Sequence, residues 1–551
     1  MPDTEHMPIG SDVLGIPIPF LPHAISVSLP TWDDNLGYVE GDQRVVDAMA
    51  TGYPRFVVHR DIQALAGICE IKFGQPGEKC FLFPSAYTAE AFRQFMTNRS
   101  PDSTSPISVR LVKYVIRAKG KDPLEIHVAL FQADVFSHGK QFWQHTGLGI
   151  SSRFTSIALD LLAQNGEYTQ THKLQHGPKS EDSDKPCGCK GDAMLAKATL
   201  CQRIAGMVID GWTPTPEIQG KDVSENDVFL FPTGMAAIWT SYQLLLAVRP
   251  QHMSVCFGFP YTDTLKILQK WGPGCRFFAG GNDADIDQLE SILQSNSISV
   301  LYTESPSNPL LRSVNLPRLR KLADQHDFLI VVDETIGTFA NVQVLPYADI
   351  VTTSLSKFFS GKANVTGGSL VLNPRSKHYP TLKPQLEGMY EDNYWWEDVL
   401  VMEYNSRDFI SRMHTINQNA EFLADFLHAH SSKPNTVLKQ IFYPKWETRA
   451  YYDICRRTSS GFSGLISLTF RTMDASRAFF DNLDCAKGPS LGTNFTLACP
   501  YTILAHYREL AWAEVYGVET GLVRISVGLE DKEDLLERVR VALDAADATG
   551  H

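Results

Sequence analysis

The chain of 551 residues lacks the long apolar segment that a membrane-spanning helix needs. No run of about 18 apolar residues occurs in it. The first residues, Met1 to His6, show neither the basic region of a secretory signal nor the arginine-rich composition of a transit peptide. We therefore expect a cytoplasmic protein without a membrane partner.

Basic residues are too few to form a surface for nucleic acid. The chain has 50 Lys and Arg residues against 62 Asp and Glu residues, a formal net charge of −12. This balance argues against nucleic acid and anionic membranes as partners, but it permits a local basic pocket for a phosphate or another small anion. A hydrophobic content of 43% is ordinary for a globular protein with a large core.

The ten cysteines lack the spacing of a disulfide-stabilised secreted domain. Cys187 and Cys189 form the one close pair, and no second pair of Cys or His lies at the spacing of a zinc finger. We expect reduced cysteines, two thiols in a loop and no metal site.

A polar, turn-rich stretch over residues 164–191 predicts a loop or linker. Upstream of it, residues 107–115 and 124–131 have the composition of strands, which indicates an α+β region with no catalytic signature. We therefore expect an N-terminal extension and linker over residues 1–190.

Apolar strands alternate with helical patterns after this linker. Strands are predicted at 228–231, 254–257, 299–303, 328–333, 350–354 and 368–372, and helices at 235–248, 261–271, 286–293 and 316–325. This alternation predicts an α/β domain over residues 191–400, with a mostly parallel sheet covered on both faces. Ligands of such sheets bind at the carboxyl ends of the strands.

The last third of the chain predicts a separate, smaller α/β domain over residues 401–551. Residues 409–428 and 533–546 have helical spacing, and residues 464–470 and 522–527 have the pattern of strands.

Lys357 follows the apolar strand that ends at residue 356. Apolar surroundings lower the pKa of an amine, and a neutral amine can form a Schiff base with an aldehyde. The ordinary alternative is a strand-end lysine whose ammonium group reaches solvent.

Small and hydroxyl residues at other strand ends suggest a phosphate site. Gly234 and Met235 open a helix, where backbone N–H groups and the helix dipole favour an anion. Ser354 and Ser356 precede Lys357 and could direct their hydroxyls to the same phosphate. Each of these residues taken alone is also common at a strand end.

Two further strand ends carry an acid and an aromatic residue. Asp333 ends an apolar strand, where a carboxylate is costly to bury unless it is paired. Phe257 closes another strand and could offer an aromatic face to a cofactor ring. The alternatives are a structural salt bridge or helix cap for Asp333 and core packing for Phe257.

Five motifs occur in a characteristic order: Pro232–Ile238, Glu304–Leu310, Val332–Thr335, Ser354–Gly361 and Asn364–Gly368. The chain thereby resembles the Cys/Met metabolism family of trans-sulfuration enzymes, which depend on pyridoxal 5′-phosphate (PLP). The likeness extends to residues 52–56, 490–492 and 524–530. The long N-terminal extension and residues 258–261 and 490–497 are most similar to fungal-type cystathionine γ-synthases.

The resemblance implies PLP-dependent fold type I, which is aspartate-aminotransferase-like, and it implies a role for each matching residue. Lys357 would hold the cofactor, Asp333 would pair with the ring nitrogen, and Asn308 would lie near the ring hydroxyl. Four further residues would hold the phosphate: Gly234, Met235, Ser354 and Ser356.

A neighbouring subunit would complete the phosphate site with Tyr53 and Arg55, which implies a homodimer or homotetramer with shared active sites. Arg524, with help near Ser490, would bind the substrate α-carboxylate. The alternative for Arg524 is a structural pair with Glu530.

The resemblance also places Phe257 where the family has a stacking tyrosine. A catalytic role of that hydroxyl would then be lost or pass to Tyr261.

The expected reaction is γ-replacement on an O-acyl-L-homoserine, with L-cysteine as nucleophile and L-cystathionine as product, a step of methionine biosynthesis. Several alternatives share these motifs. They are a γ-synthase that uses sulfide or a carbon nucleophile, a cystathionine γ-lyase, and a non-catalytic binding or assembly protein of the same fold.

Overall fold

A computed structural model describes residues 13–98, 107–167, 190–206 and 223–550 of the chain. The linker expected at 164–191 and the Cys187–Cys189 pair lie largely outside these ranges. The eight cysteines within them are free. In the same ranges, no helix has the length and hydropathy needed to cross a membrane.

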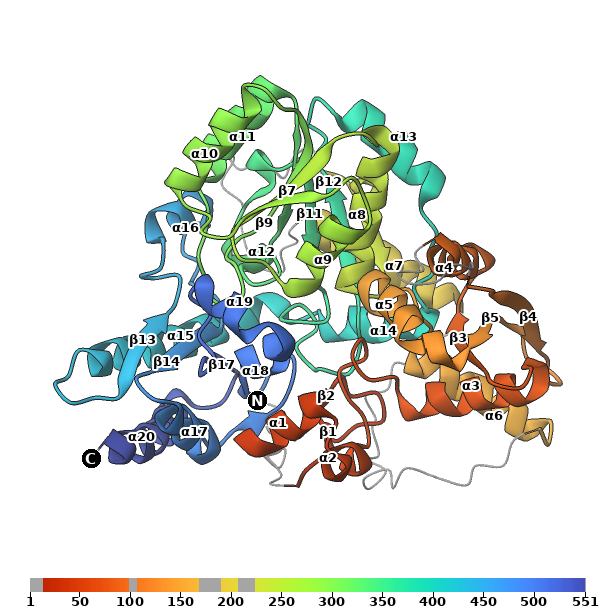
Figure 1. The fold of residues 1–551 in the computed structure, drawn as a ribbon, viewed down its shortest axis with the longest axis horizontal. Helices are drawn as coiled ribbons and strands as arrows, with labels where there is room; N and C mark the ends of the chain where they lie inside the picture. Colours follow the sequence, from red (N-terminus) through yellow and green to blue (C-terminus); the bar gives the residue numbers. More distant parts are fainter. Residues whose placement is uncertain (1–12, 99–106, 168–189, 207–222, 551) are drawn as a thin grey trace.

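The large domain is built on a seven-stranded sheet (Figure 1). Its strand order is β6 (Val228–Phe231), β12 (Gly368–Leu372), β11 (Ile350–Thr353), β10 (Leu329–Asp333), β9 (Ile298–Glu304), β7 (Met253–Phe257) and β8 (Cys275–Phe278). Neighbours from β11 to β8 are parallel, whereas β12 is antiparallel to both β6 and β11. The predicted α/β class is therefore confirmed.

Helices cover both faces because successive strand residues point to opposite sides. Leu329 and Val331 pack on the face that carries α8 (Gly234–Val248), α9 (Thr262–Lys270) and α13 (Tyr379–Met389). Ile330 and Val332 pack on the other face, with α7 (Lys190–Gly206), α10 (Asp283–Leu293), α11 (Leu316–His326) and α14 (Trp396–Asn405).

The small domain contains a five-stranded sheet. Its strand order is β13 (Leu438–Phe442), β14 (Leu465–Phe470), β17 (Val523–Ser526), β16 (Leu497–Pro500) and β15 (Ala486–Lys487). Its longest helices are α15 (Phe409–Ser431), α17 (Met473–Asn482) and α20 (Lys532–Asp547). The boundary expected at residue 400 falls inside α14.

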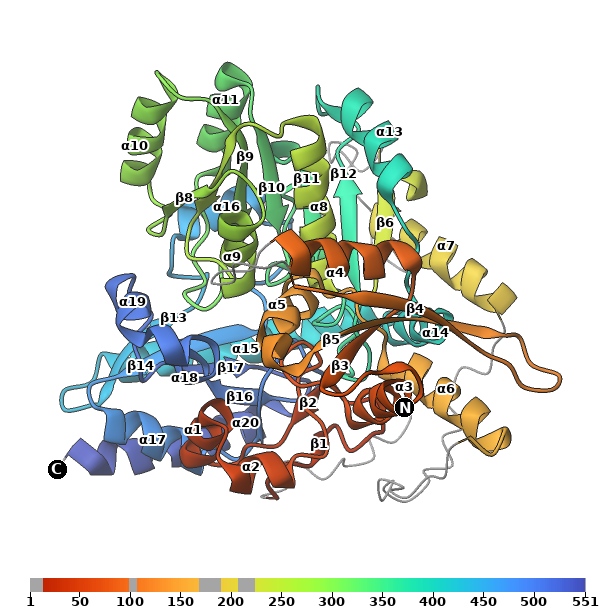
Figure 2. The same ribbon diagram turned by 45° about the vertical axis from the view of Figure 1, so that its right-hand side comes forward.

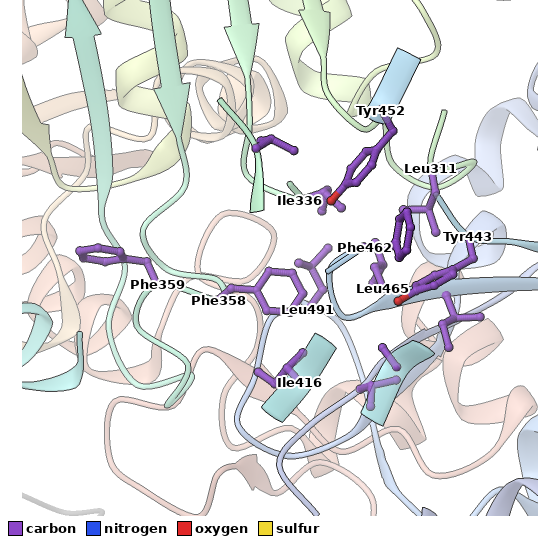
Figure 3. Packing of buried hydrophobic residues seen from close by; sticks show 14 of the residues in the cluster. Leu311, Ile336, Phe358, Phe359, Ile416, Tyr443, Tyr452, Phe462, Leu465 and Leu491 are labelled. Atoms are coloured by element: carbon purple, nitrogen blue, oxygen red, sulfur yellow. The ribbon is translucent and has the colours of Figure 1, made fainter. Parts of the chain in front are cut away.

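A continuous core joins the two domains below the predicted lysine. Phe358 and Phe359 follow Lys357 directly, and Phe358 belongs to the same buried cluster as Ile416, Leu465 and Leu491 of the small domain (Figure 3). Since this cluster crosses the domain boundary, it fixes the lysine relative to both domains.

The N-terminal extension contains an α+β unit with a three-stranded antiparallel sheet in the order β3 (Glu78–Phe83), β5 (Leu124–Gln132) and β4 (Arg110–Ile116). Helices α3 (Arg60–Phe73) and α6 (Ser152–Gln164) cover one face, and α4 (Ala86–Asn98) and α5 (Phe136–Thr146) cover the other. Its strands β4 and β5 match the predicted ones, whereas β3 was missed.

Residues 13–58 precede this unit and lie beside the small domain instead (Figure 2). They contain β1 (Pro17–Ile18), β2 (Ser26–Val27), α1 (Trp32–Glu40) and α2 (Gln43–Ala48). The backbone N–H of Leu29 donates to the carbonyl of Lys487 at 2.9 Å, and that of Trp32 donates to Asp481 Oδ1 at 2.7 Å. The remaining helices are α12 (Thr338–Asn341), α16 (Arg449–Cys455), α18 (Tyr501–His506) and α19 (Leu510–Val515).

Candidate active site

A cavity of about 140 Å³ lies at the carboxyl ends of β9, β10 and β11. Both domains and residues 53–56 contribute to its wall. This is the edge of the sheet at which the sequence predicts a ligand.

Lys357 reaches into this cavity as a buried amine. Its Nζ donates to the hydroxyl of Tyr53 at 3.1 Å and to that of Ser490 at 2.8 Å. Burial lowers the pKa of Lys357, although Tyr53 opposes this shift. The lysine therefore has the surroundings of a reactive amine.

Tyr53 is tuned by the two cations beside it. Burial raises the pKa of its hydroxyl, but Lys357 and Arg55 outweigh this effect and bring the pKa down to about 8. Since Tyr53 and Lys357 also share a hydrogen bond, a proton can pass between the phenol and the amine.

The first turn of α8 packs closely against Ser354 at one end of the cavity. Thr233 caps the helix, with its Oγ1 accepting from Ala236 N at 3.0 Å. A Cβ added to Gly234 would lie 2.6 Å from the Cβ of Ser354, so only glycine allows this approach. Met235 follows in the cavity wall, and the first-turn N–H groups can serve an anion.

The two predicted serines differ in their surroundings. Both line the cavity. The Ser356 hydroxyl is engaged by Gly367, whose N–H donates to it at 3.0 Å. For Ser354, the backbone N–H donates to Thr335 Oγ1 at 2.8 Å.

Two carboxylates, the buried Glu304 and the half-buried Asp333, end neighbouring strands in the cavity wall. Asp333 accepts from Thr335 N at 2.8 Å, and burial raises its pKa. Glu304 accepts from Tyr261 N at 2.6 Å and from Asn308 N at 3.0 Å. Burial and the nearby Asp333 raise the pKa of Glu304 to about 8.

Glu304 was not singled out from the sequence. It ends an apolar strand as Asp333 does, and that position could have marked it. Its two hydrogen bonds hold the loops that carry Tyr261 and Asn308, so it positions two other residues of the site.

Arg524 lies on the small-domain side of the cavity. Its Nη1 donates to Asn308 Oδ1 at 2.9 Å and its Nη2 donates to the carbonyl of Ser490 at 2.7 Å. The guanidinium carbon lies 4.7 Å from the centre of the Tyr501 ring, a residue that sequence reasoning missed. Glu530 does not pair with Arg524; it accepts from Thr496 N instead.

Ser490 has strained backbone geometry, because its φ is 101°, a value that residues other than glycine rarely adopt. This conformation directs its hydroxyl to Lys357 and its carbonyl to Arg524. Ser490 thus connects the lysine with the arginine.

Tyr53 and Arg55 reach the cavity from the same chain as Lys357. Arg55 donates to Asp263 Oδ2 at 2.9 Å and to the Tyr261 hydroxyl at 2.5 Å. The structure thus places the pair beside the lysine of its own chain, whereas the resemblance assigns it to a neighbouring subunit. The contacts of residues 13–58 with the small domain direct this segment over its own cavity.

Phe257 does not reach the cavity, which corrects an expectation. Its side chain is 1% exposed and packs in the core, with its ring centre 5.9 Å from that of Phe278. Tyr261 lines the cavity in its place, and burial raises the pKa of its hydroxyl. The alternation of β7 explains its burial, because Phe257 points with Val255 into the core on the face of the sheet that carries α10 and α11. Tyr261 lies beyond the strand, directly before α9.

These groups fit PLP. The first turn of α8 at Gly234 and the neighbouring Arg55 suit a phosphate, Asp333 suits a ring nitrogen, and Lys357 suits an aldehyde carbon. Among the described residues, no group of three metal-ligating side chains occurs.

Comparisons with known proteins agree with this fit. The sequence pattern of the Cys/Met metabolism PLP-dependent enzymes matches residues 223–544, and that of the N-terminal domain of fungal trans-sulfuration enzymes matches residues 61–151. The cystathionine gamma-synthase-like enzyme iboG2 of Amanita muscaria is 47% identical over 97% of this chain and 96% of its own length. The cystathionine gamma-synthase of Neurospora crassa is 38% identical over 97% of this chain and 98% of its own.

Solved structures agree on the fold. A crystal structure of cystathionine gamma synthase from Xanthomonas oryzae pv. oryzae has a TM-score of 0.51 and 22% identity, and the match covers 64% of this chain and 99% of that one. Together, the cavity, the sequence matches and the shared fold show that the chain belongs to the Cys/Met metabolism family of PLP-dependent enzymes.

Proposed function

We propose that the protein catalyses γ-replacement on an O-acyl-L-homoserine. The observation that carries this proposal is Ser490, whose hydroxyl lies 2.8 Å from the Lys357 amine while its carbonyl holds Arg524. Ser490 thus holds the guanidinium of Arg524, which can bind a carboxylate, at a fixed distance from the amine of Lys357, which can act as a base. A reaction along the carbon chain of an amino acid requires this spacing between the carboxylate site and the base.

Bound PLP supplies an electron sink for carbanions of the amino acid. The residues of the chain provide orientation and proton transfer. Arg524 holds the substrate α-carboxylate, and Lys357 Nζ, whose pKa is lowered by burial, accepts the proton from Cα. Tyr53 can take up or return a proton at Nζ through their hydrogen bond.

The overall exchange needs no oxidant or reductant. The bond between Cγ and the acyloxy oxygen breaks, and its electron pair leaves with the free acid. A bond forms between Cγ and the nucleophile, whose proton is released.

Cysteine is the nucleophile that the resemblance implies, and cystathionine would be its product. Relatives from Neurospora crassa and Saccharomyces cerevisiae bear the name cystathionine gamma-synthase, which supports this choice. Sulfide and carbon nucleophiles use the same chemistry at Cγ. The family consists of enzymes, so we do not retain the non-catalytic alternative.

The test combines labelling with product analysis. Borohydride reduction of the PLP-loaded protein, followed by peptide mapping, should place a pyridoxyl label on Lys357. Lys362, whose Nζ lies 4.7 Å from the centre of the Tyr404 ring, is the internal control and should stay unlabelled. Mass spectrometry with O-acetylhomoserine and a set of nucleophiles should show release of acetate and a γ-substituted product. Efficient cleavage of cystathionine without any synthesis would identify a lyase and refute the proposal.

A further inference from the structure

A second cavity, the vestibule, adjoins the cofactor cavity. It has a volume of about 650 Å³, and the two cavities share Phe56, Leu504 and Ala505 in their walls. These three residues therefore separate the cofactor from a wider space between residues 38–63 and α18.

The wall of the vestibule is strongly basic, unlike the chain as a whole. It contains four cationic side chains and one carboxylate: Arg60, Lys140, Lys266, Arg508 and Glu509. Glu509 is already engaged, because it pairs with Lys266 at 3.3 Å and with His506 at 3.1 Å. The vestibule thus has an excess of positive charge although the chain has a net charge of −12.

Arg60, Lys140 and Arg508 carry the unbalanced charge. In the part of the chain that the structure describes, no ion pair joins any of the three to a carboxylate, and Arg60 donates to the carbonyl of Met49 instead. Burial and the neighbouring Arg508 both lower the pKa of Lys140. An anion between the two side chains would relieve the repulsion between their positive charges.

The cofactor cavity offers no carboxylate to an ammonium group on the side that faces the vestibule. Its acidic residues are Glu304 and Asp333, and both already have another role. Glu304 accepts two backbone N–H groups, and Asp333 lies at the end suited to the ring nitrogen. The wall towards the vestibule is apolar, with Phe56, Leu504 and Ala505, so a buried ammonium there would be unpaired.

We propose that the second substrate is an anionic nucleophile that carries no ammonium group and enters through the vestibule. This inference rests on the proposed γ-replacement and specifies the nucleophile. It disfavours zwitterionic cysteine, and it favours hydrosulfide or a carboxylate-bearing nucleophile. The cations at Lys140 and Arg508 attract the anion, and the apolar wall excludes a positive charge.

Four thiols with one reactive group and different charges test the proposal. Mercaptopropionate carries only a carboxylate, cysteamine only an ammonium, cysteine both and mercaptoethanol neither. With the PLP-loaded enzyme and O-acetylhomoserine, kcat/KM is measured for each thiol and corrected to the thiolate concentration, because the thiolate is the nucleophile. Mercaptopropionate should be used about tenfold better than cysteine, and cysteamine should be the poorest.

The donor must be tested separately, because O-succinylhomoserine also carries an additional carboxylate. Repeating the series with that donor shows whether the vestibule binds the acyl group instead. The order of the thiols should be the same with both donors. An order that depends on the donor would assign the vestibule to the acyl group and overturn the proposal.

Charge variants give the second measurement. Lys140→Gln and Arg508→Gln should each lower the ratio of kcat/KM for mercaptopropionate to that for mercaptoethanol by about threefold to tenfold. The matched control is Lys321→Gln, an exposed lysine on α11 whose removal should leave the ratio unchanged. Ala505→Glu should raise use of cysteamine relative to Ala505→Gln, which adds the same bulk without the charge.

A binding measurement separates affinity from turnover. Propionate has no thiol, and calorimetry should show that it binds the wild-type protein more tightly than Lys140→Gln. Release of acetate with cysteine as the best thiol would overturn the inference and leave the γ-replacement intact. No acetate with any thiol would overturn the proposed function and the inference with it.

Discussion

Arg524 depends on the geometry of its guanidinium as well as on its charge. Two of its nitrogens bind two different acceptors, Asn308 Oδ1 and the Ser490 carbonyl, and its planar face lies over Tyr501. A lysine keeps the positive charge but cannot form this fork.

Arg524→Lys should therefore lower kcat/KM for the O-acylhomoserine by about 2–3 kcal/mol in transition-state free energy. Steady-state kinetics with a saturating nucleophile measures this effect. Arg471→Lys, an exposed arginine at the end of β14, is the control and should behave as wild type. Equal loss in both variants would show that Arg524 acts only on the fold.

Buried carboxyl groups should make the stability of the protein without PLP depend on pH. Burial raises the pKa of Glu334 to about 8 even though Arg457 opposes it, and Glu304 is raised to about 8 as well. Between their ordinary pKa values and pH 8, the folded protein binds more protons than the unfolded chain. The free energy of unfolding should then fall as the pH rises through this window.

Thermal unfolding of the PLP-free protein from about pH 5 to pH 8 measures this dependence. Glu334→Gln cannot ionise at that position, so its melting temperature should fall less steeply over the same window. Because the pKa of Lys357 is lowered, its titration makes the free energy of unfolding rise with pH at higher pH. This contribution is the same in wild type and in Glu334→Gln, so the difference between their two slopes removes it. Identical slopes would show that Glu334 does not titrate in this range.

At the scale of elements, the start of α8 sets how closely a phosphate can approach. Gly234→Ala would place a methyl group 2.6 Å from the Cβ of Ser354 and should weaken retention of PLP by at least tenfold, because backbone on both sides has to shift. Equilibrium dialysis with PLP measures this loss. Gly388→Ala in α13, whose added Cβ meets nothing within 4 Å, should retain PLP as wild type does.

The elements of the large domain could be predicted because their strands are continuous apolar runs. β9, β10 and β11 lie within one or two residues of their predicted ranges. β8 was missed, since Cys275–Phe278 is short and half-buried and places Arg276 in its middle. Such a strand gives no periodic signal, and its pairing with β7 decides its structure.

The place of a residue in the candidate site was predictable where an ordered motif carries it, as with Lys357, Asp333 and Arg524, which all line the cavity. It was not predictable where the direction of a side chain decides. Phe257 and Tyr261 are four residues apart, and only the face of β7 and the turn after it determine which ring lines the cavity. For Tyr53, the sequence cannot distinguish its own chain from a neighbour's.

At the scale of the whole molecule, one chain holds all the residues assigned to the cavity. Tyr53 contacts Lys357 of the same chain, and Arg55 contacts Tyr261 and Asp263. Inactive Arg55→Ala and Lys357→Ala chains, refolded together from denaturant, should therefore recover no activity. Each chain would still lack one of its own groups.

Steady-state turnover of the refolded mixture provides the measurement, and wild-type protein treated in the same way is the control. Recovery of about a quarter of the control activity or more would show that a partner subunit supplies Arg55, against the arrangement seen here.

The arrangement of residues 13–58 also affects the order in which the protein can be made. Ser26 bonds to Pro489 across 463 residues, and Tyr53 bonds to Lys357 across 304. A ribosome therefore releases Tyr53 long before Ser490 and Arg524 exist, and the site cannot close until synthesis is almost finished. Contacts this distant in sequence form slowly, because a long loop has to close first. The α+β unit of residues 60–164 has its own core and can fold in the meantime, leaving the segment before it exposed until the small domain emerges.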